Sequence, residues 1–106
     1  MLHAQWLGVI WALRALAYAC HGQCEEAETA VTTALAKGKR KHIPAWAKLH
    51  LYLGQAQLHC GQQNQAMEHF VTARSVDPQG YYGRIAAQAL RNMGKITSDS
   101  QQIQHH

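Results

Sequence analysis

The stretch 53–78, LGQAQLHCGQQNQAMEHFVTARSVDP, decides the fold that the sequence predicts. Apolar residues recur at helical spacing on both sides of Gly61. Asp77-Pro78 closes the stretch, because a helix usually ends at or before the residue that precedes a proline. Gly54 and Ala66 place small side chains where two antiparallel helices must approach closely. The stretch therefore predicts one helix–turn–helix hairpin with Gly61 in its turn.

A weaker copy of this hairpin lies upstream. Ala27 and Ala66 are 39 residues apart, and the same offset separates Gly22 from Gly61. The whole chain then predicts five helices in antiparallel hairpins and no strand, an all-α fold. Asn64 is the expected N-cap of the fourth helix. The expected helices span about 2–21, 24–37, 44–61, 64–77 and 79–93, the last ended by Gly94.

At these positions the chain resembles the tetratricopeptide repeat (TPR) family, whose units repeat with a period near 34 residues. The two units would be roughly 8–41 and 47–80, separated by an insertion. The second unit matches better, and it carries Leu53, Gly54, Gly61, Ala66, Phe70, Ala73, Asp77 and Pro78. The first unit supplies the aromatic residues Trp11 and Tyr18.

The resemblance implies a helix-turn-helix superhelix of about two TPR units, capped by a C-terminal helix over residues 81–94. The expected domain is therefore 1–94. The polar tail 95–106 is poor in apolar residues, and we expect it to be disordered.

In the TPR family, one face of the first helix of each hairpin lines a concave groove that holds a partner. Carrying that face over gives the groove residues Val9, Ala12, Leu16 and Ala19, then Lys48, Leu51, Gln55 and Leu58, then Tyr82, Ile85 and Ala89. This groove is apolar with a polar edge and suits an amphipathic helix or an extended apolar segment. We expect Leu51→Glu to weaken partner capture without loss of helix content.

Part of the family grips C-terminal carboxylates with a clamp of lysine and asparagine. The positions of that clamp hold Ala12, Leu16 and Tyr52 here, so this activity is not expected.

The implied function is a scaffold that binds another protein or a peptide, without a cofactor and without enzymatic chemistry. The serines Ser75, Ser98 and Ser100 lie at a helix end or in the tail, and no strand precedes a phosphate-binding loop. Three alternatives stay open: a small chaperone for a secreted or aggregation-prone cargo, a nucleic-acid-associated protein using the basic loop 37–42, and a repeat segment of a larger regulator. Self-association through the N-terminal helix is also expected, because Trp6 and Leu7 would otherwise lack a neighbour.

The formal net charge is +4, and four of the cations fall within the segment 37–41. A solvated loop explains this run better than a nucleic-acid contact, because no aromatic platform lies beside it. No stretch approaches the roughly 20 apolar residues of a membrane span, so no membrane partner is expected.

The cysteines are Cys20, Cys24 and Cys60. An odd number argues against a complete disulfide framework, and we expect reduced thiols and a cytoplasmic location. A Cys20–Cys24 bond is conceivable and would leave Cys60 unpaired. Together with His59 the cysteines are candidates for a zinc site, but their spacing is not that of a zinc knuckle. Buried cysteines and a half-exposed histidine explain these residues better, and no metal is expected.

Overall fold

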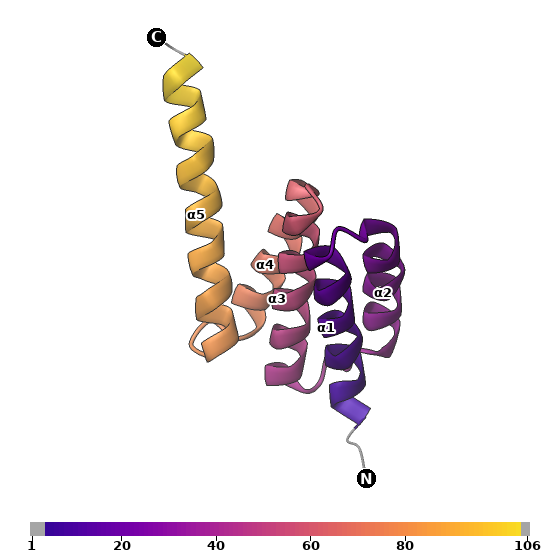
Figure 1. The fold of residues 1–106 in the computed structure, drawn as a ribbon. Coiled ribbons are helices and arrows are strands. Elements are labelled where there is room, and N and C mark those ends of the chain that lie inside the picture. Colours follow the sequence, from indigo (N-terminus) through magenta and orange to yellow (C-terminus); the bar gives the residue numbers. More distant parts are fainter. Residues whose placement is uncertain (1–3, 105–106) are drawn as a thin grey trace.

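The chain folds into stacked helical hairpins (Figure 1). The structure is a computed structural model that describes the backbone of residues 4–104 and the side chains of residues 4–94. Its elements are η1 (Ala4–Trp6), α1 (Leu7–Cys20), α2 (Cys24–Lys37), α3 (Ile43–His59), α4 (Gln63–Val76) and α5 (Tyr81–Gln104). No strand occurs in this part of the chain, so the predicted all-α, repeat-like fold is confirmed.

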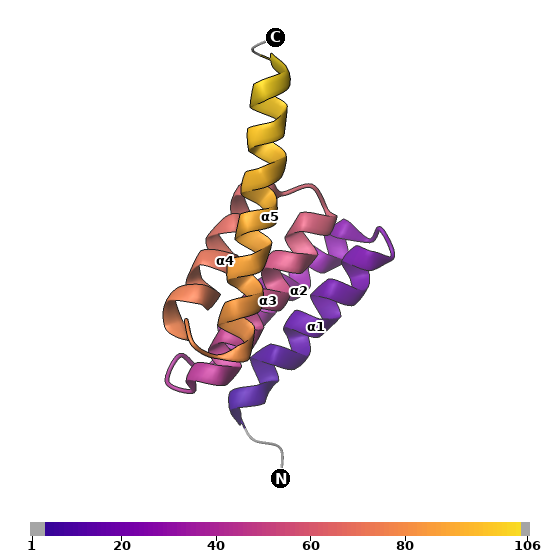
Figure 2. The ribbon, with the colours of Figure 1, turned by 90° about the vertical axis from the view of Figure 1, so that its left-hand side faces the viewer.

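The α1–α2 hairpin lies at one side of the molecule, the α3–α4 hairpin at the centre and α5 at the other side (Figure 1). Helix α1 packs against both α2 and α3, α3 packs against α4, and α5 packs against α4 and α3. Seen from the side of α5, the helices of the two hairpins lie behind it (Figure 2). The first helices α1 and α3 therefore adjoin directly, and α5 is next to α3.

The two hairpin turns have the same geometry. Gly22 and Gly61 adopt positive φ angles of 75° and 78°, which glycine reaches without steric cost. The next residue in each turn donates its N–H across the end of the preceding helix, from Gln23 to Tyr18 and from Gln62 to Gln57, both at 2.9 Å. This is the Schellman pattern that caps helix C-termini. The predicted turn glycines are confirmed.

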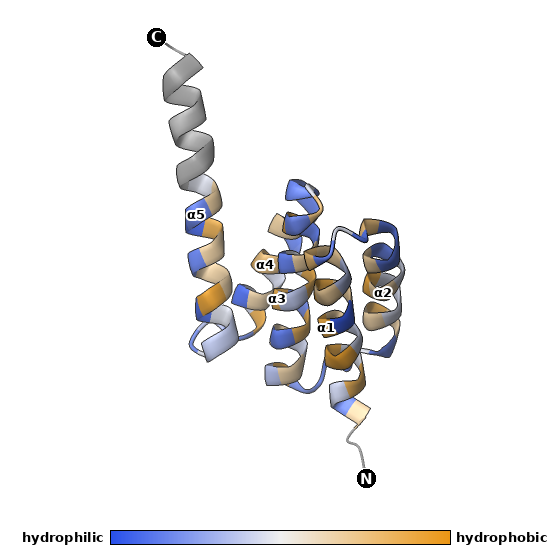
Figure 3. Cartoon of the chain, in the orientation of Figure 1, coloured by the Kyte–Doolittle hydropathy of each residue, from blue (hydrophilic) through white to orange (hydrophobic). Residues whose placement is uncertain are grey.

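Small residues allow the helices to approach. A Cβ atom at Gly54 would lie 2.6 Å from the Phe70 ring, so only glycine fits there beside this ring. Ala66 is fully buried next to it, which confirms the predicted close approach of α3 and α4. Between α1, α2 and α3 the core is also rich in alanine, and it includes Val9, Ala12, Ala15, Ala27, Ala30, Ala34, Leu49 and Leu53. Apolar residues run along most of α1 (Figure 3).

Three helix ends differ from the predictions. Helix α1 begins at Leu7, after the short η1, and not at residue 2. Helix α4 begins directly after the turn, with Gln62 and not Asn64 as its N-cap, because the Schellman geometry already sets its direction. Helix α5 continues through Gly94 to Gln104, whereas we expected its end at Gly94 and a disordered tail. A single glycine weakens a helix but does not end it. Residues 105–106 of that tail lie outside the described residues.

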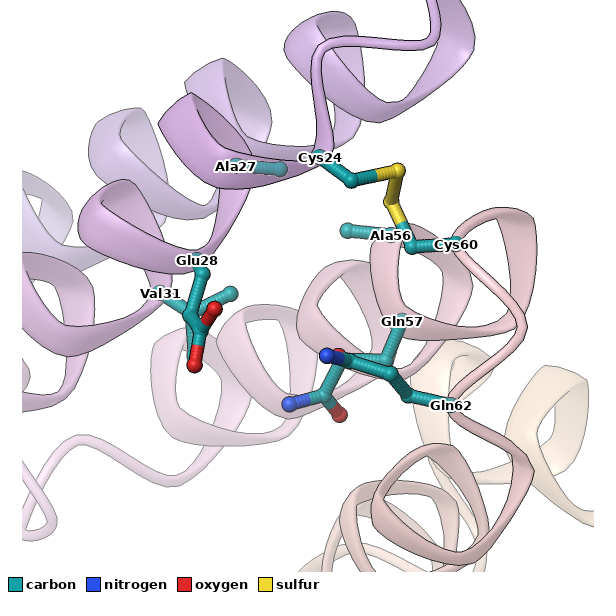
Figure 4. Close-up of a pocket in the computed structure, with 8 residues that line it drawn as sticks. All are labelled: Cys24, Ala27, Glu28, Val31, Ala56, Gln57, Cys60 and Gln62. Carbon is teal, nitrogen blue, oxygen red and sulfur yellow. A yellow bond between two sulfur atoms is a disulfide. The ribbon is translucent and has the colours of Figure 1, made fainter.

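The cysteine prediction is wrong, because a disulfide links Cys24 to Cys60 and leaves Cys20 free and exposed. The bond joins the start of α2 to the end of α3, with Cα atoms 5.8 Å apart (Figure 4). Beside it lies a cavity of about 10 Å³, close to the volume that one water molecule needs. The side-chain amide oxygen of Gln57, Oε1, is buried near this cavity and has no hydrogen-bond partner among the described residues.

Candidate functional site

Four of the predicted groove residues are core residues: Val9, Ala12, Ala19 and Leu51. Val9, Ala12 and Ala19 of α1 are buried, because α1 packs directly on both α2 and α3. Leu51 is only 2 % exposed and belongs to the cluster around Phe70. None of the four can contact a partner in this conformation, and Leu51→Glu would test stability rather than partner binding.

The other predicted groove residues reach the surface to different degrees. Leu16, Lys48 and Gln55 are half-buried, and Leu58 is exposed. Tyr82 and Ile85 are half-buried at the edge of the Phe70 cluster. The part of the predicted groove that still lies at the surface is therefore formed mainly by residues of α3 and α5.

Lys48 lies at the centre of this surface, framed by aromatic rings from three elements. Its Nζ atom is 5.2 Å from the ring centroid of Tyr82, 5.6 Å from that of Trp6 and 5.8 Å from that of Tyr52. These distances are within the range of cation–π attraction. We call this surface the Lys48 face, and it comprises Trp6, Lys48, Tyr52, Gln55, Tyr82 and Ile85.

Local structure holds each ring in place. Trp6 ends η1 and lies edge-on to the ring of His42, at 5.4 Å between centroids. His42 is itself fixed, because its Nδ1 accepts a hydrogen bond from the backbone of Ala45 and caps α3. Tyr52 follows Lys48 by one helical turn and so shares its side of α3. Tyr82 lies in the first turn of α5, against α3.

The charge of Lys48 has no acidic partner. Among the described side chains it forms no ion pair, and its polar neighbours are the two tyrosines. The Tyr82 hydroxyl raises the pKa of Lys48 above its ordinary value, and burial opposes this effect only in part. The ammonium group stays charged at neutral pH, so the face presents one positive charge within an aromatic surface.

Trp6 and Tyr52 were missing from the predicted groove. The spacing of Lys48 and Tyr52 by four residues could have placed Tyr52 beside the lysine. Trp6 carried no such signal, because only the packing of η1 against α3 brings it there.

The four candidate metal ligands do not form one site. Cys24 and Cys60 are bonded to each other, and Cys20 and His59 are exposed. Residues 4–94 contain no group of three or more His, Cys, Asp or Glu side chains placed to hold a metal ion.

Helix α1 keeps an apolar surface that no other part of the described chain covers. Leu7, Ile10 and Leu13 are 38–43 % exposed, and Tyr18 is 36 % exposed. Self-association through this helix stays a prediction. Across the described residues, none of the helices combines the length and the hydropathy that crossing a membrane requires.

A pair of histidines joins α3 to α4 on another side of the hairpin. The Nδ1 atoms of His50 and His69 are 2.8 Å apart, so one of them carries a hydrogen and donates a hydrogen bond to the other. His50 is only 6 % exposed. Burial, then His69 and then Arg40, lower the pKa of His50 to about 4. Burial also lowers the pKa of His69, and the nearby Glu68 opposes that effect.

We expect acid to destabilise the fold through this pair. The unfolded chain binds protons at His50 near its ordinary pKa of 6.5, but the folded chain does so only near 4. The contribution of His50 to stability is therefore full above pH 6.5 and is lost as the pH falls to about 4, by on the order of 3 kcal/mol. Urea unfolding at a series of pH values measures this loss.

His50→Phe should flatten the pH dependence of the unfolding free energy between pH 6.5 and about pH 4. His59→Gln changes an exposed histidine and should leave this pH dependence as it is in the parent chain. An unchanged slope in His50→Phe would contradict the assignment.

Comparisons of the chain with protein-family models, with curated proteins and with solved structures find no match.

Proposed function

We propose that the Lys48 face binds a segment of another protein, and that the chain acts as a TPR-like scaffold without covalent chemistry. The observation that supports this most is the Lys48 ammonium group, framed by three aromatic rings and left without a carboxylate partner among the described side chains. A charge of this kind is best neutralised by a group from outside the chain.

The composition of the face favours a protein ligand. Tyrosine and tryptophan are enriched at protein interfaces, since their rigid rings bury a large area at small entropic cost. Gln55 adds an amide, and Ile85 adds an apolar edge. The segment that fits would carry apolar side chains around one acidic residue, which would pair with Lys48.

A selection from a phage-displayed library of random peptides tests this proposal. We expect the selected peptides to share an acidic residue between apolar ones. Lys48→Met should weaken their binding by about tenfold or more, because it removes the charge that their carboxylate needs. Isothermal titration calorimetry with synthetic versions of the peptides measures the change.

Lys37→Met is the matched control, because Lys37 is an exposed lysine in the last turn of α2. It should retain nearly the full affinity. Equal losses in the two variants would mean that net charge alone attracts the peptides. Peptides that bind Lys48→Met as tightly as the parent chain would rule out the Lys48 face.

The disulfide bears on where the chain acts. A cytoplasmic location stays a prediction from the cysteine count, and the Cys24–Cys60 bond favours an oxidising compartment instead. Holding a cargo as a chaperone would use the same face, and would differ by forming a stable one-to-one complex.

A further inference from the structure

A second pocket lies on the other side of α3 from the Lys48 face. Trp46 and His50 line this pocket. Each is two positions from Lys48 in the sequence, so both lie on the side of the helix nearly opposite to Lys48. Thr72 and Val76 of α4 and Arg40 of the preceding loop complete the walls. The volume is about 460 Å³, within the range of about 300–1,000 Å³ that small-molecule sites occupy.

The charge of this pocket is positive. The guanidinium group of Arg40 lies 5.7 Å from the centre of the Trp46 ring, and no carboxylate lines the pocket. Lys39 and Lys41 flank Arg40 in the loop, and both are exposed. The basic run, which we expected to be a solvated loop, therefore borders a pocket with an aromatic wall.

Only one of the two ring nitrogens of His50, which lines the back of the pocket, has a hydrogen-bond partner among the described residues. His50 uses its Nδ1 with His69, but its Nε2 is buried and has no hydrogen-bond partner among the described residues. A buried polar atom without a partner costs about 1–3 kcal/mol. When His69 donates to the Nδ1 of His50, the Nε2 of His50 carries the proton and needs an acceptor.

We propose that this pocket binds a phosphate monoester, with its oxyanion between the guanidinium group of Arg40 and the Nε2–H of His50. The group esterified to the phosphate would lie against Trp46 and Val76. Such a phosphate carries a charge of about −1.5 to −2 at neutral pH, which matches three consecutive cations better than a single carboxylate does. The guanidinium fork also suits phosphate geometry. The site is independent of the partner that the Lys48 face would bind.

Binding requires a small movement. The Nε2 atom of His50 is covered in this conformation, and the Trp46 ring lies against the imidazole with 4.4 Å between ring centroids. The phosphate reaches Nε2 only if the side chains of Trp46 or Arg40 shift, a rotamer change of the kind that ligands commonly induce.

Nuclear magnetic resonance of the histidine side chains tests the proposal in the full chain. Inorganic phosphate, phenyl phosphate and acetate are each titrated at constant ionic strength. We expect a saturable shift of the His50 Nε2 resonance with both phosphates and none with acetate. Phenyl phosphate should bind more tightly than inorganic phosphate, because its ring can contact Trp46 and Val76.

Two variants that lose the same charge distinguish a specific phosphate site from general electrostatic attraction to the basic loop. Arg40→Gln should weaken phosphate binding by about tenfold or more, as loss of a charged hydrogen bond implies. Lys39→Gln, in the same loop but outside the pocket lining, should change it far less. An unchanged amide spectrum confirms that the two glutamine variants fold. Arg40→Lys should bind phosphate with an affinity between those of the parent chain and Arg40→Gln. Equal losses in the two glutamine variants, a response that does not saturate, or an equal response to acetate would each overturn the proposal.

Discussion

Replacing Phe70 with alanine is expected to lower the free energy of unfolding by about 3–5 kcal/mol. Phe70 is the largest of the fully buried side chains among the described residues. Its ring rests on the bare backbone of Gly54 in α3 and packs with Leu51 and Ala86, so one side chain connects α3, α4 and α5. Its removal would leave a cavity that the surrounding alanines are too small to fill. Urea unfolding followed by circular dichroism measures the loss.

Val71→Ala is the control for this experiment. Val71 is the next residue in α4 but is 37 % exposed, so its truncation should cost less than about 1 kcal/mol. If Phe70→Ala is too unstable to measure, Phe70→Leu should show a smaller loss of the same sign. A Phe70→Ala variant as stable as Val71→Ala would mean that the α3–α4 hairpin is packed differently.

The second large effect is expected from the disulfide. Replacing both Cys24 and Cys60 with serine should lower the free energy of unfolding by about 2–4 kcal/mol, because the bond closes a long loop in the unfolded chain. The two cysteines are separated by 36 positions in the sequence. The bond also connects α2 and α3, which otherwise touch each other little. Thermal unfolding of the oxidised protein and of the double variant measures the difference.

Cys20→Ser is the matched control, because Cys20 is free and exposed. Cys20→Ser should not change the midpoint of thermal unfolding. A reductant should lower the midpoint of the parent chain and of Cys20→Ser, but not that of the double variant. A parent chain that is insensitive to the reductant would show that the two hairpins are not linked.

Local rules predicted most of the fold. The bounds of α2 match the expected 24–37, because the Gly22 turn precedes this helix, Gly38 follows it and glutamates occupy its first turn. Gly22 and Gly61 were identifiable for the same reason, since a hairpin turn of this type needs a positive φ. Pro44 lies in the first turn of α3, where its missing N–H leaves no helical hydrogen bond unmade.

What the sequence could not show depends on distances between remote segments. The Cys24–Cys60 pairing arises only when α2 and α3 are placed together, and cysteine counting pointed the other way. Lys48 and Tyr82 were placed on the binding face through the family resemblance, but Val9, Ala12 and Leu51 were assigned to it as well. Their burial follows from how closely α1, α3 and α4 pack. The histidine pair also escaped prediction, because its members are 19 positions apart.

The central claim is that a partner binds the face of the hairpin stack on which Lys48 lies. The most direct measurement is an amide chemical-shift map of the isotope-labelled protein with the tightest peptide from the selection described above. We predict that the largest shifts fall at Trp6, Lys48, Tyr52, Gln55 and Tyr82, and that α2 is unaffected. Shifts confined to α2 and to the outer side of α4, with Lys48 and Tyr82 unchanged, would contradict the claim.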